Sequence, residues 1–132
     1  MTVINQRVYS GTTWEKQVAY CRARRVGNLV FVAGTTAVDE SGAVVAPGDL
    51  GGQTRFIFRK IEQALKQCNA SLRDVVRTRM YVTRIADFEQ FANAHREVFE
   101  GIDPVASCIQ IGALVDPNLL VEIEVDAVVC RG

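Results

Sequence analysis

The chain has 132 residues, of which 48% are hydrophobic, so residues 1–132 are expected to form a single domain around one core. Fifteen Lys and Arg balance fifteen Asp and Glu, which disfavours polyanionic partners and makes nucleic acid an unexpected ligand. There is no run of about 20 apolar residues and no signal-peptide pattern, so a cytoplasmic protein with no membrane partner is expected. One histidine and four scattered cysteines give no zinc-site spacing, and no metal is expected.

The first half of the chain is predicted to form two strands and a helix. Residues 18–24 and 28–35 are rich in β-branched and aromatic residues, and Val26-Gly27-Asn28 between them predicts a tight hairpin. Tyr9 and Trp14, which precede this hairpin, are expected to pin the N-terminal segment to the domain. After a loop rich in Gly, Pro and Asp, apolar residues recur at helical spacing and predict a helix over residues 53–68.

The second half repeats the strand-to-helix order and adds two strands. Residues 75–82 alternate as a strand, and Asp87 with Gln90 offers an N-cap for a helix that carries His95 and Phe99. Pro104 ends that helix, and residues 107–114 and 119–129 predict the last two strands. The order ββαβαββ predicts an α+β fold.

The predicted strands have two different faces. In the last strand, Val121, Ile123 and Val125 alternate with the acidic Glu122, Glu124 and Asp126. In residues 75–82, the even-numbered residues are expected to pack on the helices, while Arg77, Arg79 and Tyr81 share the face of the acidic residues. That second face is either solvated or part of an oligomer interface.

Three segments resemble one known family. Gly27-Asn28-Leu29-Val30-Phe31-Val32-Ala33-Gly34 is similar to the strand and glycine that open the RidA/YjgF proteins. Asp74-Val75-Val76-Arg77-Thr78 resembles their central strand. Pro104-Val105-Ala106-Ser107-Cys108-Ile109 with Val121-Glu122-Ile123-Glu124 resembles their C-terminal signature. The resemblance runs in matching order from about Tyr20 to Val129.

The resemblance implies a chorismate-mutase-like subunit, with a mixed sheet and two helices on one of its faces. It also implies a homotrimeric barrel with a small-molecule cleft at each subunit boundary. Family members with the full signature hydrolyse reactive enamines and imines to keto acids and ammonia, and they need no cofactor. A cation holds the substrate carboxylate, and an acid/base group positions the attacking water.

Carried over residue by residue, the resemblance places the water-positioning glutamate at Glu122. It also places a cleft cysteine at Cys108, a cleft tyrosine at Tyr20 and the glycine that follows the second strand at Gly34. Three family residues are replaced: the carboxylate-binding arginine corresponds to Ala106, the serine before the glycine to Ala33, and a cleft asparagine to Ala92. These replacements predict a larger and more apolar pocket with altered specificity.

Two questions stay open at this stage. Arg22 is a candidate anion anchor, but Arg22, Arg24 and Arg79 are more simply explained by ion pairs with Glu124, Asp126 or surface carboxylates. His95 is expected to be a hydrogen-bonded core or interface residue rather than a base. The expected function is a specialised enamine/imine hydrolase. The alternatives are a non-catalytic metabolite-binding or chaperone-like trimer and, more distantly, an endoribonuclease, an activity with which some family members are labelled.

Overall fold

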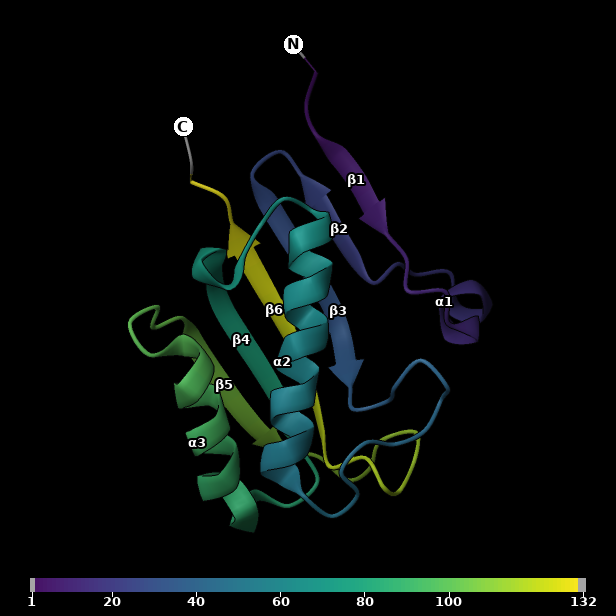
Figure 1. The fold of residues 1–132 in the computed structure, drawn as a ribbon, viewed down its shortest axis with the longest axis vertical. Coiled ribbons are helices and arrows are strands. Elements are labelled where there is room, and N and C mark those ends of the chain that lie inside the picture. The colour runs from purple at the N-terminus through teal and green to yellow at the C-terminus, as the bar shows by residue number, and fades with distance from the viewer. Residues whose placement is uncertain (1, 131–132) are drawn as a thin grey trace.

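A computed structural model describes residues 2–130. The strands are β1 (Asn5–Val8), β2 (Ala23–Val26), β3 (Leu29–Thr36), β4 (Val75–Val82), β5 (Val105–Gln110) and β6 (Val121–Val128). The α-helices are α1 (Thr13–Val18), α2 (Leu50–Gln67) and α3 (Phe88–Phe99), and two 3₁₀ turns, Leu72–Asp74 and Ile85–Asp87, precede β4 and α3. Figure 1 shows α2 lying across the middle of the sheet and α3 beside it. The predicted α+β class is confirmed.

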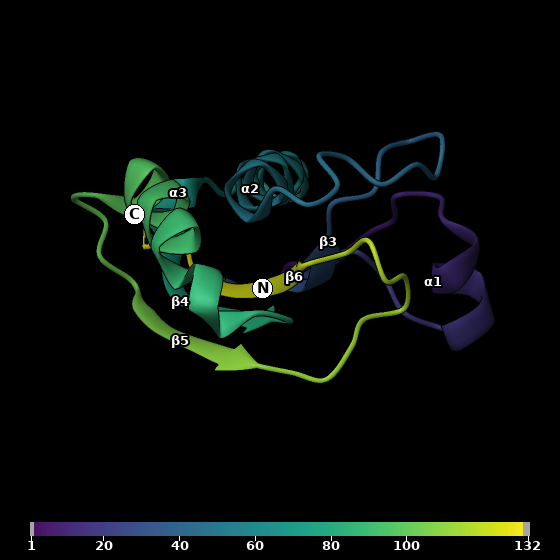
Figure 2. The same ribbon diagram turned by 90° about the horizontal axis from the view of Figure 1, so that it is seen from below.

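The strands form one mixed sheet in the order β1-β2-β3-β6-β4-β5. Only β4 and β5 run parallel, because α3 connects them as a crossover, while all other neighbours are antiparallel. Figure 2 shows α2 and α3 on the same face of this sheet, and its other face carries no helix. The prediction of a mixed sheet with two helices on one face is therefore confirmed.

The core lies between α2 and the centre of the sheet. Ile57, Ile61 and Leu65 form the apolar stripe of α2 and are fully buried. They pack in one cluster with alternate residues of β6, of which Val121, Ile123 and Val125 are fully buried. At the surface, Arg55 of α2 donates two hydrogen bonds of 2.8 Å to the carboxylate of Glu97 on α3. The alternation predicted for the last strand is confirmed.

The N-terminal region differs from the prediction. Residues 18–24 are not one strand, because α1 extends to Val18 and Ala19 adopts the left-handed conformation at its C-cap. Tyr20 then donates its backbone N–H to the carbonyl of Glu15, so β2 begins only at Ala23. The six-residue α1 has no amphipathic repeat to reveal it, and β1 is a polar four-residue strand that needs β2 as its partner.

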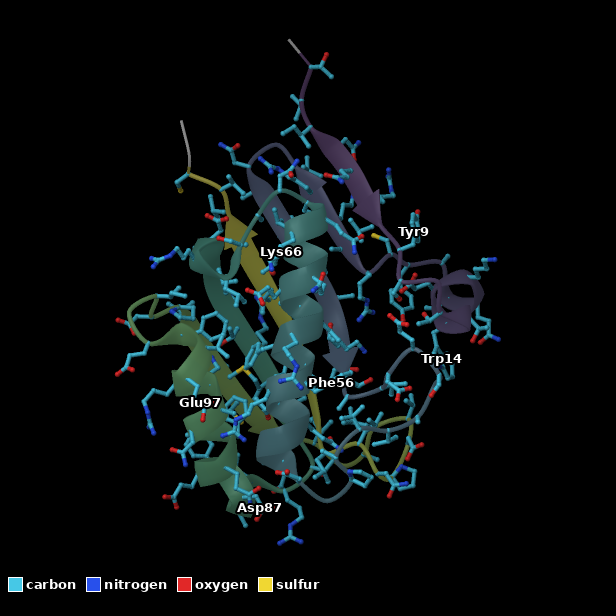
Figure 3. The ribbon with its side chains drawn as sticks, viewed as in Figure 1. Tyr9, Trp14, Phe56, Lys66, Asp87 and Glu97 are labelled. Atoms are coloured by element: carbon cyan, nitrogen blue, oxygen red, sulfur yellow. The ribbon has the colours of Figure 1, made fainter. Side chains whose placement is uncertain are left out.

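Tyr9 and Trp14 do not pin this segment to the rest of the chain. Tyr9 is 61% exposed and Trp14 is 53% exposed, and Figure 3 shows both at the outer side of the molecule next to α1. The buried residue of α1 is instead Glu15. The prediction for the two aromatic residues was wrong because a polar contact, rather than apolar burial, attaches this helix.

Three local features differ from the predictions for the second half of the chain. A β-bulge between Val75 and Arg77 leaves Val75 buried and Val76 45% exposed, so the predicted face of Val76 was wrong. The strand expected over residues 107–114 is β5, which starts directly after Pro104 and ends at Gln110. Asp87 precedes α3 as predicted, but its carboxylate pairs with Arg84 Nε at 3.3 Å and does not cap the helix.

Candidate functional site

Glu122 lies on the face of the sheet that has no helices. It occupies β6 opposite Thr36 of β3 and Tyr81 of β4, and its neighbours Val121 and Ile123 point into the core. The Glu122 side chain is partly buried and lies against Gly34: a Cβ added at Gly34 would be 2.8 Å from Glu122 Cδ. The structure thus brings together two of the residues singled out in the sequence.

A β-bulge creates the space for this contact. The register of β3 against β6 shifts between Val32 and Thr35, so Ala33 and Gly34 lie in the irregular part of the strand. Because glycine has no side chain at this point, the carboxylate of Glu122 can cross the backbone of β3. Gly34 is therefore required for close approach of the carboxylate rather than for an unusual φ angle.

Gly34→Ala is expected to lower any activity that depends on Glu122 by about 10- to 100-fold, because a shift of about 1 Å in a catalytic group can cost that much. The added Cβ would meet the flexible end of Glu122, which can move, so stability should change little. Steady-state rates and thermal unfolding check both points. Gly112→Ala is the matched control, since a Cβ there meets nothing within 4 Å, and equal losses in the two variants would contradict the assigned contact.

The environment of Glu122 favours its neutral form. Burial raises the pKa of this carboxyl, and the nearby Glu124 raises it further, while Arg22 acts in the opposite direction. Within residues 2–130, no group donates a hydrogen bond to the Glu122 carboxylate. A carboxyl with a raised pKa is suited to proton exchange, and its oxygens are not committed to a structural contact.

Arg22 lies beside this carboxyl at the end of β3. Its Nη1 donates to the carbonyl of Gly34 and to Thr35 Oγ1, both at 3.1 Å. The guanidinium also lies 5.7 Å from the centre of the Tyr20 ring, so Tyr20 and Arg22 belong to the same group as Gly34 and Glu122. The Nε atom of Arg22 is buried without a hydrogen-bond partner among the described residues.

The carboxylate that faces Arg22 is Glu15, which the sequence did not reveal. Glu15 Oε2 lies 3.8 Å from Arg22 Nε, and Glu15 accepts hydrogen bonds from the backbone N–H and hydroxyl of Ser10. Arg22 therefore pairs with a buried residue of α1 and not with Glu124 or Asp126 as one hypothesis expected. No sequence pattern could indicate Glu15, because its partners Ser10 and Arg22 lie in irregular segments before and after α1.

Lys60 is a second cation that sequence reasoning missed. It projects from α2 and donates to the carbonyls of Thr36 and Val38 at 2.8 and 2.9 Å. Burial and the nearby Arg22 lower the pKa of Lys60 to about 8. Its position between Arg59 and Ile61 of a helix gave no signal of this role. Two cations thus bind the C-terminal end of β3: Arg22, which precedes β2, and Lys60 of α2.

The other charged residues of the open face form ion pairs. Arg79 Nη1 lies 3.1 Å from Asp126 and 3.6 Å from Glu124, and Arg77 Nε lies 3.8 Å from Asp126. Tyr81 donates its hydroxyl to Glu124 at 3.0 Å. The predicted cross-strand pairing is confirmed for Arg79. Arg24 is exposed on the same face, where it and Glu124 line a groove of about 790 Å³ with Tyr20 and Ala33.

A second group of predicted residues lies elsewhere. Ala92, Ala106 and Cys108 line a pocket of about 640 Å³ between α3 and β5. Its further lining includes aromatic residues of α3, Met80 of β4, and charged and polar residues from the end of α3 and the segment that leads into β5. Burial raises the pKa of the Cys108 thiol, which makes a reactive thiolate at this position unfavourable.

His95 belongs to the same pocket. Its Nε2 lies 3.0 Å from Thr78 Oγ1, and its ring packs against Phe58, Phe91 and Phe99. Burial lowers its pKa, so the ring is neutral at neutral pH. The predicted hydrogen bond of a partly buried histidine is confirmed.

One protomer does not bring the two groups together. Cys108 is paired with Met80, which is 2% exposed and points toward the helices, whereas Glu122 is paired with Tyr81 and points away from them. Paired residues in a sheet share a face, so the pocket and Glu122 lie on opposite faces, and β4 separates β5 from β6. A cleft that contains both groups requires more than one chain.

Two further features of the described residues bear on the chemistry. No group of three or more His, Cys, Asp or Glu side chains within residues 2–130 is arranged to hold a metal ion. None of the helices in that range is long and apolar enough to cross a membrane.

Residues 12–129 match the family model described as Endoribonuclease L-PSP. Among curated relatives, the protein SCO2049 of Streptomyces coelicolor is 32% identical over 92% of this chain and 90% of its own length. The 3-aminoacrylate deaminase RutC of Acinetobacter baylyi is 34% identical over 79% of this chain and 82% of its own length.

The solved structures agree with these matches. Rv2704 of Mycobacterium tuberculosis, a member of the YjgF/YER057c/UK114 family, superposes with a TM-score of 0.87 at 45% identity, over 96% of this chain and 100% of its own. The fold and the matched residues define a protein of the RidA/YjgF class. The chain belongs to this family, which the family model describes as Endoribonuclease L-PSP.

Proposed function

We propose that the protein is an enamine/imine hydrolase of altered specificity, which acts in clefts between the subunits of a homotrimer. The observation that carries this proposal is the partly buried Glu122 carboxyl, which has no hydrogen-bond partner in residues 2–130 and lies against Gly34. The 3-aminoacrylate deaminase RutC, a relative at 34% identity, supports a reaction at a carbon bonded to nitrogen.

The roles of the residues follow from their chemistry. Glu122 takes a proton from the attacking water and later gives a proton to the leaving nitrogen, and its raised pKa suits both steps. The positive charge of Arg22 stabilises the ionised form of Glu122. Tyr20, which lies against Arg22, forms one wall of the cleft. Cys108 and Ala106 shape the pocket on the other side of the cleft.

The arrangement of one protomer supports an assembly of several. Glu122 and the α3–β5 pocket lie on opposite faces, so the pocket of one subunit must meet the Glu122 group of a neighbour. The open face also exposes Phe31 at 45%, Val105 at 59% and Ile109 at 54%, between ion-paired residues. Apolar residues on an otherwise charged sheet face are typical of a surface that is covered by another subunit.

The proposal predicts that the wild-type protein accelerates ammonia release from freshly generated imines or enamines, both small and bulky, above the spontaneous rate. An equal concentration of heat-denatured protein is the control. The same preparation should sediment at micromolar concentration with a mass about three times the 14.5 kDa of the chain. A monomeric mass would contradict the cleft, and acceleration by the denatured protein would show that the reaction does not need the fold.

The alternative function is a metabolite-binding trimer without catalysis. It is favoured by Ala106, Ala33 and Ala92, which stand where the family signature has polar residues. This alternative would be established if the trimer binds a ligand tightly but hydrolyses no imine faster than the spontaneous rate.

A further inference from the structure

The pocket between α3 and β5 has walls that suit a ring or a branched chain. Phe91 and Phe99 are buried, and both pack on the ring of His95, with centroid distances of 5.7 and 4.8 Å. Phe88 also lines the pocket, and the centroid of its ring lies 6.0 Å from that of Phe91. Aromatic walls of this kind bind apolar and aromatic groups, and a volume of about 640 Å³ lies within the range of small-molecule sites.

The charges around this pocket disfavour an anion. The lining contains one cation, Arg96, against two carboxylates, Glu100 and Asp103. Arg96 is exposed, and its Nη2 donates to Asn93 Oδ1 at 2.8 Å rather than toward the pocket. The neutral His95 adds no positive charge, and Ala106 offers only a methyl group. A ligand carboxylate placed here would lose water without gaining a cation.

The hydrogen bond of His95 adds a polar preference. Thr78 Oγ1 is fully buried, and His95 Nε2 is its one side-chain hydrogen-bond partner in residues 2–130. The hydroxyl proton therefore goes to Nε2, and the neutral ring carries its own proton on Nδ1. The neutral His95 and the hydroxyl of Ser107 are thus uncharged polar groups of the lining, and neither replaces a charged anion anchor.

We propose that the cleft takes a neutral imine or enamine that bears an aryl or branched alkyl group and no carboxylate, with its apolar group in the α3–β5 pocket. This inference rests on the proposed function and names its substrate class. Imines of this class arise when a primary amine is oxidised, so the reaction that supplies the substrate is an amine oxidation. Hydrolysis then produces an aldehyde and ammonia.

The step balances with water as the only co-reactant. The water oxygen bonds to the C=N carbon, and the π electrons of the double bond pass to the nitrogen, which takes a proton. Glu122 accepts a proton from the water and transfers it to the nitrogen, which gives a carbinolamine with an amino group. A second proton passes through Glu122 from the carbinolamine hydroxyl to the amino nitrogen; the C–N bond then breaks, ammonia leaves with the bonding electrons, and the oxygen forms the C=O bond of the aldehyde.

The test uses two imines that differ only in the carboxylate. A flavin amine oxidase converts phenethylamine to the neutral imine, and an amino-acid oxidase converts phenylalanine to the corresponding 2-imino acid. Semicarbazide traps the free imine, and hydrolysis by the protein lowers the amount that is trapped. This decrease gives kcat/KM for each imine, and the two values are compared. The kcat/KM for the neutral imine is expected to be at least about tenfold higher. A buried carboxylate that lacks a charged hydrogen-bond partner loses binding free energy of that size.

One substitution should reverse this preference. Ala106→Arg places a guanidinium on exposed β5 at the pocket, and it is expected to raise kcat/KM for the 2-imino acid and lower it for the neutral imine. Val115→Arg is the matched control, because it adds the same charge at a position that is 79% exposed and outside the pocket. A wild-type preference for the 2-imino acid overturns the inference.

Binding of stable analogues separates this inference from the proposed function. Phenylacetamide and phenylacetate share the ring and differ in charge, and calorimetry should show at least about tenfold tighter binding of the amide by the wild type. If the amide binds in this way while no imine is hydrolysed faster, the proposed catalysis fails and the ligand class stands. If phenylacetate binds as well as the amide, or neither binds, the ligand class is wrong whatever the protein catalyses.

Discussion

Replacing Glu122 with glutamine is expected to slow imine hydrolysis by at least about 100-fold, because general acid/base catalysis contributes on that order or more. Glutamine keeps the size of the side chain and its place against Gly34, but it cannot exchange the proton. The kcat/KM values of the two proteins on the same imine give the ratio directly. The trimer and its unfolding midpoint should be unchanged.

The pKa of Glu122 gives this prediction a second readout. The base form is the carboxylate, so the wild-type rate should fall as pH decreases through this pKa. Since burial raises the pKa, the fall should begin at a higher pH than for an ordinary glutamate. A raised folded-state pKa also means that ionised Glu122 destabilises the fold as pH rises through it, so Glu122→Gln should not lower stability at neutral pH.

Glu124→Gln is the matched control for this experiment. Glu124 lies on the same strand and face, but it accepts the Tyr81 hydroxyl at 3.0 Å and lies 3.6 Å from Arg79. Its loss should alter those contacts and leave most of the hydrolysis rate. A Glu122→Gln protein as active as wild type, or equal losses in both variants, would exclude Glu122 as the acid/base group.

Truncation of Phe58 is expected to have the largest effect on stability. Phe58 of α2 is 2% exposed and makes edge-to-face contacts with Phe99 at 5.1 Å and His95 at 5.7 Å. Phe58→Ala removes these contacts and leaves a cavity between α2 and α3, which should lower the free energy of unfolding by about 3–5 kcal/mol. Because total stabilities are about 5–15 kcal/mol, this is a large fraction of the whole.

Urea unfolding at one fixed protein concentration measures this loss, since the stability of an oligomer depends on concentration. Phe56→Ala is the control on the same helix. Phe56 is only partly buried and contacts Arg59 and Lys60 as a cation–π partner, so its loss should be below about 2 kcal/mol. Equal losses at both positions would show that Phe58 does not hold α3 to the core.

The main elements could be predicted because their signals are local. The apolar stripe Ile57, Ile61 and Leu65 fixes α2, and the alternation around Glu122 fixes β6. α1 and β1 could not be predicted, because a six-residue helix and a polar edge strand depend on contacts made elsewhere in the chain. The bulge that exposes Val76 has no sequence signal of its own.

The candidate site was predictable in part for the same reason. The resemblance to the family singled out Glu122 and Gly34, and the structure places them in contact. It could not show that Cys108 faces away from Glu122, because that follows from the pairing of β4 with β5 and β6. Glu15 was also missed, since its partners Ser10 and Arg22 are joined to it only by the folded chain.

The division of the candidate cleft between two faces of the protomer has a consequence for how such proteins diversify. The residues that would determine ligand specificity lie on α3 and β5. The carboxyl that would transfer protons is positioned by β3 and β6. Substitutions such as alanine at position 106 can therefore accumulate on the first pair of elements without disturbing the second. Under the proposed assembly, new ligand preferences arise while an inherited proton-transfer group stays in place.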